Sequence, residues 1–273
     1  MICIDGRGAV YGEVWYHEDP PRDSAVDIVL YRQRNAPIAG ARYTAVLSLV
    51  SELSGGEGAI TEKLGKNCHY KIKRAEAKDG LRMEFIPNPE SRLDEFRAFY
   101  DAFAGQKSLE PSDPKWLLAA CKARQLTLTC ALHDGEALVW HAYVTCGNAA
   151  RLQYTGSCFR NRESDYRALV GRANRWLHWR DMLRFAEMGL QRYDWGGLFE
   201  DESLPERAGI NRFKRDFGGR QERTYDCTVP VTIRGRIWLP LRDAWRRYRP
   251  SSSGSRSLPT NAGFTRTTDH LVR

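Results

Sequence analysis

The sequence predicts an α+β fold in which one mostly antiparallel central sheet is flanked by helices. Two features carry this prediction. Short runs rich in β-branched and aromatic residues are separated by Gly, Pro and Asp, whereas longer segments carry apolar residues at helical spacing. The second half of the chain has the order helix pair, three closely spaced strands, long helix, strand, helix and strand, which is typical of α+β domains with a single sheet.

In the first third of the chain, three runs combine aromatic and β-branched residues and are predicted to be strands, at 12–16, 27–32 and 43–49. A basic helix is expected from about 57 to 78, where Asp79 and Gly80 end it. A further strand, LRMEFI, is predicted at 81–86.

Two amphipathic helices that could cover a sheet are expected at 90–105 and 113–123. Three strands joined by short turns follow and predict an antiparallel meander, at 126–132, 137–146 and 151–157. The remaining predicted elements are a long helix, a short strand, a helix, a strand and a basic segment, at 163–189, 191–195, 205–217, 222–233 and 238–249.

The overall composition is that of a globular protein with a sizeable core, since 42% of its 273 residues are hydrophobic and 28% are charged. No apolar run is long enough to span a membrane, and the first residues lack a signal-peptide pattern, so we expect a cytoplasmic protein. The seven cysteines and six histidines show no metal-ligand spacing, which predicts no metal site and no disulfide framework. The formal net charge of +8 favours anionic partners.

The segment that joins the predicted strand 151–157 to the long helix is a candidate cofactor-binding loop. It carries Gly156, Ser157, Arg160 and Arg162. Free backbone N–H groups at a helix start, together with two guanidinium groups, would bind an anion such as a pyrophosphate or a tRNA phosphate. The alternative is a solvated turn with an ordinary helix cap.

Two further stretches are candidates for the chemistry itself. YDWGG places the carboxylate of Asp194 at a strand end, before a glycine pair at 196–197 that lets a ligand approach the backbone. GINRFKRDFGG, at 209–219, places Phe213 and Lys214 in a helix, where the lysine could reach an oxyanion or a phosphate. Taken alone, Asp194 could equally be a turn former or part of a structural ion pair.

YDWGG, a polar spacer and INRFKRDFGG together resemble the C-terminal signature of the Fem-like branch of the GNAT acyltransferase superfamily. NCHYKIKRAEAKDGLRMEF, at 67–85, is similar to a helix and strand of the same family, and GEVWY with DIVLYR also resembles it. The resemblance spans roughly residues 10–235. It implies a GNAT-like sheet with an abbreviated N-terminal half, because Fem peptidoglycan enzymes carry two complete halves. The usual acetyltransferase phosphate loop, Arg/Gln-x-x-Gly-x-Gly/Ala, does not occur at 156–164.

The resemblance also implies a division of the chain into three parts. Residues 1–88 would form a strand-rich region with the basic helix, packed with the main domain. Residues 89–249 would form the GNAT-like catalytic domain. The Ser-, Gly-, Thr- and Pro-rich residues 250–273 are expected to be a flexible tail.

Roles follow from the resemblance residue by residue. Lys214, assisted by Phe213, would stabilise the tetrahedral oxyanion or the leaving end of the donor. Asp194 would hold or deprotonate the acceptor amine. The cofactor would also contact Gly196, Gly197 and Asn211, and the acceptor would contact Tyr70 and Arg74.

His141, Trp140 and Tyr154 are candidates from the meander. His141 could act as a general base, although a buried structural histidine is the competing interpretation. It alternates with Trp140 along its strand and would therefore face the opposite side of the sheet. Trp140 and Tyr154 could contact acceptor or donor, and an ordinary packed aromatic is the alternative for Tyr154.

Three functional hypotheses result. The first is an N-acyltransferase that uses acyl-CoA and acylates an amino sugar or a related precursor of a surface polysaccharide, with a small-molecule or nucleotide-linked acceptor. The second keeps the enzyme and changes the donor to aminoacyl-tRNA. The third is a noncatalytic basic module that binds RNA or anionic lipid, for which the arginines at 242, 246, 247 and 249 could contact nucleic acid or a membrane.

Overall fold

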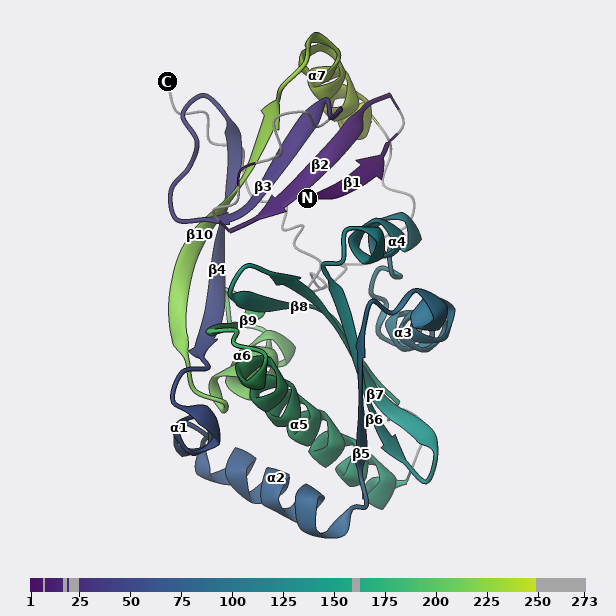
Figure 1. Ribbon diagram of the computed structural model, residues 1–273, viewed down its shortest axis with the longest axis vertical. Helices are drawn as coiled ribbons and strands as arrows, with labels where there is room; N and C mark the ends of the chain where they lie inside the picture. The colour runs from purple at the N-terminus through teal and green to yellow at the C-terminus, as the bar shows by residue number, and fades with distance from the viewer. Residues whose placement is uncertain (7, 17–18, 20–24, 159–162, 249–273) are drawn as a thin grey trace.

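The computed structural model describes residues 1–248 except 7, 17–18, 20–24 and 159–162 (Figure 1). The predicted tail at 250–273 and the arginines 160 and 162 therefore lie outside the described residues. One sheet of ten strands forms the centre, in the order β1-β2-β3-β10-β4-β9-β8-β7-β6-β5. Its strands are β1 Ile2–Asp5, β2 Val10–Trp15, β3 Ile28–Arg34, β4 Arg42–Glu52, β5 Arg82–Pro87, β6 Leu126–His133, β7 Glu136–Cys146, β8 Ala149–Ser157, β9 Arg192–Gly197 and β10 Arg220–Pro230.

Helices cover both faces of the sheet (Figure 1). They are α1 Gly56–Glu62, α2 Lys66–Lys78, α3 Leu93–Lys107, α4 Pro114–Lys122, α5 Ser164–Glu187, α6 Pro205–Arg215 and α7 Ile233–Tyr248, with a short 3-10 turn at Glu90–Arg92. Within the described residues, none of these helices has both the length and the apolar character that crossing a bilayer requires.

The predicted mostly antiparallel sheet is confirmed. Two neighbouring pairs, β2 with β3 and β8 with β9, are parallel, and the other pairs are antiparallel. The predicted meander corresponds to β6, β7 and β8. β10 lies between β3 and β4, so a strand from near the end of the chain joins the N-terminal strands to the rest of the sheet.

Two cores lie on opposite faces of the meander. On one face, α5 buries Trp176, Leu177 and Phe185 in a large cluster that also contains residues of α1 and α2. On the other face, α3 and α4 bury Phe96 and Trp116. The alternation of side chains along β6, β7 and β8 supplies both clusters, because successive residues of a strand point to opposite faces.

The predicted helix from 57 to 78 is wrong in one respect, since it is two helices with a break at 63–65. The backbone N–H of Gly65 donates to the carbonyl of Asp216 at 2.7 Å, and a Cβ at this glycine would contact the same oxygen. This contact with a distant segment interrupts the helix, and helical periodicity alone could not show it. The short edge strand β1 was also not predicted.

Helix α7 is anchored to β2 and β3 by its inner side. Leu239 is buried with Ala9 and Ile28, and the indole N–H of Trp238 donates to the hydroxyl of Tyr11. Gly235, in the first turn of α7, lies against the backbone of Asp27 so closely that a Cβ would overlap that carbonyl. A glycine is therefore required for the helix to approach the strand.

We predict that Gly235→Ala lowers the free energy of unfolding by about 1–3 kcal/mol, because the added methyl group must displace α7 from the sheet. Gly171→Ala is the matched control, since Gly171 lies inside α5 and a Cβ there meets no atom within 4 Å. It should raise stability by up to about 1 kcal/mol through helix propensity. Urea unfolding measures both changes, and equal effects of the two variants would contradict this packing of α7.

Candidate active site

The parallel strands β8 and β9 part after a short stretch of pairing. They are in register only from Ala149 with Arg192 to Arg151 with Asp194. Beyond that point β9 stays paired with β4 as far as Gly197, whereas β8 follows β7 as far as Ser157. The sheet is therefore split between β8 and β9 beyond Arg151 and Asp194, while each of these strands stays paired with its other neighbour.

Lys214 joins the two predicted motifs at this split. Its Nζ donates to the carbonyl oxygen of Gly197 at 2.7 Å, and only 3% of the residue is exposed. Burial, with a smaller contribution from nearby Arg151, lowers the pKa of Lys214 from 10.5 to about 7, and Asp194 opposes the shift. The glycine pair of YDWGG and the lysine of INRFKRDFGG thus lie in contact, as the proposed site requires.

Asp194 is the acidic group of the same cluster and is 1% exposed. Its Oδ1 accepts the backbone N–H of Gly196 at 2.7 Å, and its Oδ2 lies 3.5 Å from Nε of Arg151. Burial raises the pKa of the Asp194 carboxyl, against the lowering effect of Arg151 and of the Gly196 N–H. Asp194 therefore shapes the turn and forms an ion pair, which were its alternative roles, and it also lies next to the lysine.

Arg151 is a member of the site that the sequence analysis missed. It lies on β8, is 2% exposed, and donates to Oε1 of Gln153 at 3.1 Å. Its guanidinium carbon lies 5.1 Å from the ring centroid of Trp15. Its Nε makes no hydrogen bond to any described residue. The signal in the sequence was an arginine, the one charged residue of the strand AARLQYTGS, because such a charge is buried only with partners.

On the α5 face, His141 belongs to a buried hydrogen-bond network. Its Nδ1 lies 2.8 Å from Oδ2 of Asp181, which also accepts the hydroxyl of Tyr143 at 2.5 Å. The hydroxyl oxygens of Tyr143 and Tyr193 are hydrogen-bonded at 2.7 Å, and the Tyr193 hydroxyl lies 2.7 Å from Nδ1 of His178. His141 and Trp140 belong to opposite faces, as predicted, and His141 is fully buried.

His178 connects this network to the lysine. Its ring contacts Phe213 and Trp195, at centroid distances of 5.7 and 4.7 Å. Burial lowers the pKa of His178 well below its usual value, and the charges of His141, Lys214 and Arg175 add to this effect. His178 and Asp181 were not predicted, although Asn174, His178 and Asp181 recur at helical spacing on the buried face of α5.

Within the described part of the chain, His141, His178 and Asp181 also form a group whose potential ligand atoms lie within 4.8 Å of one another. Three observations favour hydrogen bonding over coordination. Both ring nitrogens of His141 already face Asp181 and Asn174. Nδ1 of His178 is hydrogen-bonded to the hydroxyl of Tyr193. The two imidazole rings are stacked with centroids 3.9 Å apart instead of converging on one point.

Several predicted site residues lie elsewhere. Trp140 and Tyr154 are packed in the core under α3 and α4, and a Cβ at Gly156 would contact the rings of that same core. Tyr154 accepts the backbone N–H of Asp113, so it is the packed tyrosine of the alternative interpretation. Ser157, the last residue of β8, is half-buried.

Asn211 has a structural role in place of the expected cofactor contact. It is fully buried, accepts the backbone N–H of Phe199 and donates to the Phe199 carbonyl and to Glu202. These bonds fix the loop between β9 and α6. Tyr70 and Arg74 are exposed on α2, the helix that packs on α5, so the structure does not bring these two predicted acceptor contacts to Lys214.

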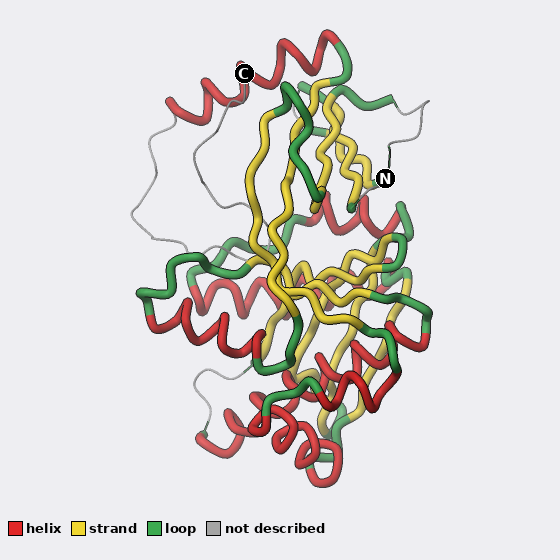
Figure 2. The backbone as a smooth tube through the Cα atoms, turned by 90° about the vertical axis from the view of Figure 1, so that its left-hand side faces the viewer, coloured by secondary structure: helices red, strands yellow, loops and turns green. Residues whose placement is uncertain are grey.

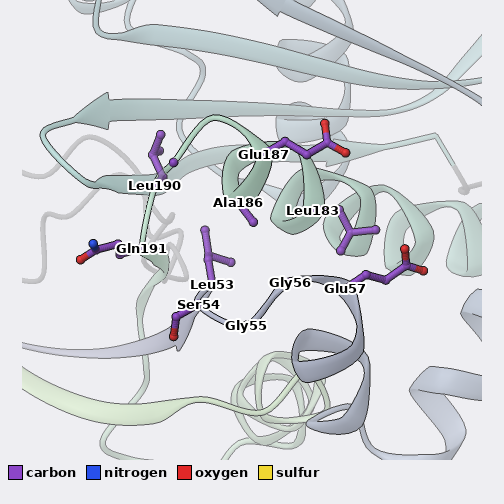
Figure 3. Close-up of a pocket in the computed structure, with 11 residues that line it drawn as sticks. Leu53, Ser54, Gly55, Gly56, Glu57, Leu183, Ala186, Glu187, Leu190 and Gln191 are labelled. Carbon is purple, nitrogen blue, oxygen red and sulfur yellow. The ribbon is translucent and has the colours of Figure 1, made fainter.

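A pocket of about 470 Å³ lies at the C-terminal end of α5, next to the start of α1 (Figure 3). Its labelled side chains include Leu53, Glu57, Leu183 and Glu187. None of the predicted site residues lines it. It adjoins residues 190–191, just before β9 begins, whereas Gly197 is at the other end of that strand, so we do not assign the chemistry to this pocket.

No family model matches this sequence, and no curated protein is similar to it in sequence. Solved structures do share its fold. FemX is 11% identical, with a TM-score of 0.56 over 71% of this chain and 63% of FemX. L-PGS from Bacillus licheniformis is 13% identical, with a TM-score of 0.50 over 79% of this chain and 70% of that one. The chain therefore shares its fold with FemX and with L-PGS, which agrees with the fold that the sequence resemblance implied.

We predict that Lys214→Met stabilises the protein most below pH 7. Because the folded-state pKa of about 7 lies below the ordinary value of 10.5, the unfolded state binds more protons between these two values. The stability of the native protein therefore rises with pH across this window, and the advantage of the variant shrinks by roughly 1.4 kcal/mol per pH unit. Urea unfolding at several pH values tests this, with exposed Lys73→Met as the control. A pH-independent difference would contradict a buried ammonium.

We also predict that Tyr193→Phe costs about 1–3 kcal/mol of stability, because it leaves the buried His178 and Tyr143 each short of one partner. Tyr143→Phe should cost a similar amount, and the double variant should cost less than the sum, since the two tyrosines share one bond. Tyr70→Phe is the control because Tyr70 is 63% exposed. If Tyr193→Phe changed the free energy of unfolding as little as the control does, the network would not contribute to the stability of the fold.

Proposed function

We propose that this chain is an N-acyltransferase that moves an acyl group from an acyl thioester, acyl-CoA in our first hypothesis, to the amine of an amino sugar or a related surface-polysaccharide precursor. One observation carries the proposal: the buried ammonium of Lys214 lies on the Gly197 carbonyl beside Asp194, where β8 and β9 part. The fold shared with FemX and L-PGS, and the resemblance of the two motifs to the Fem-like signature, support the same class of reaction.

The proposed reaction needs a stabilised oxyanion and an acceptor for one proton. The amine nitrogen attacks the thioester carbonyl, whose π electrons move to oxygen; they return to form the amide as the thiolate leaves with the electrons of the carbon–sulfur bond. Lys214 in its ammonium form would donate to the oxyanion, since it is held in a water-poor environment where such donors are most effective. The proton lost by the nitrogen would pass to Asp194, whose raised pKa makes the carboxylate a stronger base than an ordinary aspartate.

Arg151 supplies the second cationic donor of the proposed site. Its buried Nε lies 3.5 Å from Oδ2 of Asp194 and makes no hydrogen bond to a described residue, so a ligand oxygen at the split would supply that bond. The same guanidinium faces Asp194 and keeps that carboxylate oriented. The net charge of +8 agrees with a phosphate-bearing donor. For this reason we place the donor's polar part near Arg151 and the reacting carbonyl near Lys214.

The donor is identified by ligand-induced stabilisation in thermal unfolding. Coenzyme A at 100 times its Kd should add about 2.7 kcal/mol to the free energy of unfolding. Stabilisation by tRNA alone, with binding that falls steeply with salt, would assign the donor to aminoacyl-tRNA instead. A response to neither ligand would contradict both donors and leave the noncatalytic hypothesis standing.

The role of Lys214 is tested by the release of thiol from acyl-CoA in the presence of a panel of amino sugars. We expect Lys214→Met to reduce kcat by about 10²–10³-fold, the usual loss for one oxyanion donor, and Lys73→Met to leave it unchanged. Activity should also fall as pH rises through about 7, because Lys214 then loses the proton that it donates. Activity that instead rises through this pH would assign Lys214 as the base, and full activity of Lys214→Met would exclude this site.

A further inference from the structure

Helix α7 presents an apolar stripe on the side that faces away from the sheet. Its four members recur every fourth residue and are exposed by 77, 59, 58 and 54%; they are Ile233, Ile237, Leu241 and Trp245. Residues four apart lie on one face of a helix, so these side chains form a continuous band about 18 Å long. A contiguous exposed apolar surface of this kind marks a contact with a partner or a membrane.

The orientation of the stripe is fixed by the opposite side of the helix. Leu239 is 4% exposed, and the indole of Trp238 donates to Tyr11. Arg42 and Asp243 form an ion pair between β4 and α7. The inner face is therefore fully used in packing on the sheet, and the apolar band cannot turn inward without loss of these contacts.

The charge of α7 indicates the kind of partner. The helix carries five arginines and one aspartate, so it is strongly basic. The side chain of Arg234 is 62% exposed, and Arg236 is also exposed. A basic amphipathic helix that carries a tryptophan in its last turn has the chemistry of helices that lie in the interface of an anionic membrane.

Shape and charge also argue against the other occupants. Figure 1 shows α7 at one end of the molecule, and Figure 2 shows it crossing that end at a steep angle to the long axis, so that a flat surface can meet its outer side. A second copy would bring the same basic helix against itself, and like charges repel. RNA would satisfy the arginines and leave the apolar band in water.

We propose that α7 is a membrane-docking helix, which binds the surface of a bilayer that contains anionic lipid by burying Ile233, Ile237, Leu241 and Trp245 among the acyl chains while its arginines contact the headgroups. This interaction is separate from the acyl transfer proposed above and does not depend on it. The site of Lys214 lies on α6 and makes no use of the stripe.

Co-sedimentation of the full chain with vesicles tests the proposal. Vesicles of phosphatidylcholine with phosphatidylglycerol should bind the protein, and vesicles of phosphatidylcholine alone should bind it at least tenfold more weakly. Ile237→Ser should weaken binding about tenfold, because about 1.4 kcal/mol of apolar contact is lost. Arg236→Gln should weaken binding to anionic vesicles about fivefold, the equivalent of about 1 kcal/mol for one arginine at such a surface.

Leu118→Ser is the matched control, since Leu118 lies on α4 and is 39% exposed. It should bind vesicles like the native protein. Circular dichroism and thermal unfolding establish that each variant is folded; if Ile237→Ser failed to fold, Leu241→Ser would take its place.

Five outcomes would overturn the proposal, of which four concern the vesicles and the oligomeric state. The first is that the native protein does not bind vesicles, and the second is that it binds neutral and anionic vesicles equally. The third is that Ile237→Ser and Leu118→Ser weaken vesicle binding equally. The fourth is a concentration-dependent dimer that Ile237→Ser abolishes, without any vesicle binding. This fourth outcome would assign the stripe to a second copy of the chain. Binding of tRNA that competes with vesicles and is unaffected by Ile237→Ser would likewise assign the arginines to nucleic acid and overturn the membrane assignment.

Discussion

The bond between Lys214 Nζ and the carbonyl of Gly197 is the constraint on which the proposed site depends. It ties α6 to the end of β9, where the strand has left β8 and has only β4 beside it. Burial of an ammonium group is costly, and the lowered pKa of Lys214 expresses that cost. An uncharged residue could hold a helix against a strand with a smaller desolvation cost, so the presence of lysine here argues for a role beyond packing.

The surroundings of the lysine are organised in two polar groups that differ in charge. On the β8 side, Arg151 and Asp194 form a charged pair that continues through Trp15 to the buried Glu13. On the α5 side, tyrosine and histidine side chains form a network in which His178 is kept uncharged. An uncharged imidazole beside Lys214 avoids a second buried cation, so the network lets the ammonium persist near neutral pH.

The sequence predicted the elements of the meander and the long helix, because local periodicity carries that information. It did not predict Arg151, whose importance comes from the parting of two strands, or the break before α2, which comes from a contact with Asp216. The family resemblance assigned Asn211 to the cofactor, whereas in the structure its side chain bonds to the backbone of Phe199. The spacing of residues in the sequence identifies the side chains that could bind a ligand. Only the tertiary contacts show which of these side chains already bond to other parts of the protein.

One strand relates the proposed membrane helix to the proposed site. β10 follows α6 directly and leads into α7, and its pairing with β3 and β4 makes it a stiff connection. Eleven residues of strand span at most roughly 36 Å. β10 runs along the long axis of the molecule toward α7 (Figure 1), so if α7 lies flat in a membrane, Lys214 stands away from the surface by up to about that length. The acceptor would then be a soluble molecule, or the end of a headgroup long enough to extend well above the bilayer, which agrees better with a nucleotide-linked amino sugar than with a compact lipid amine.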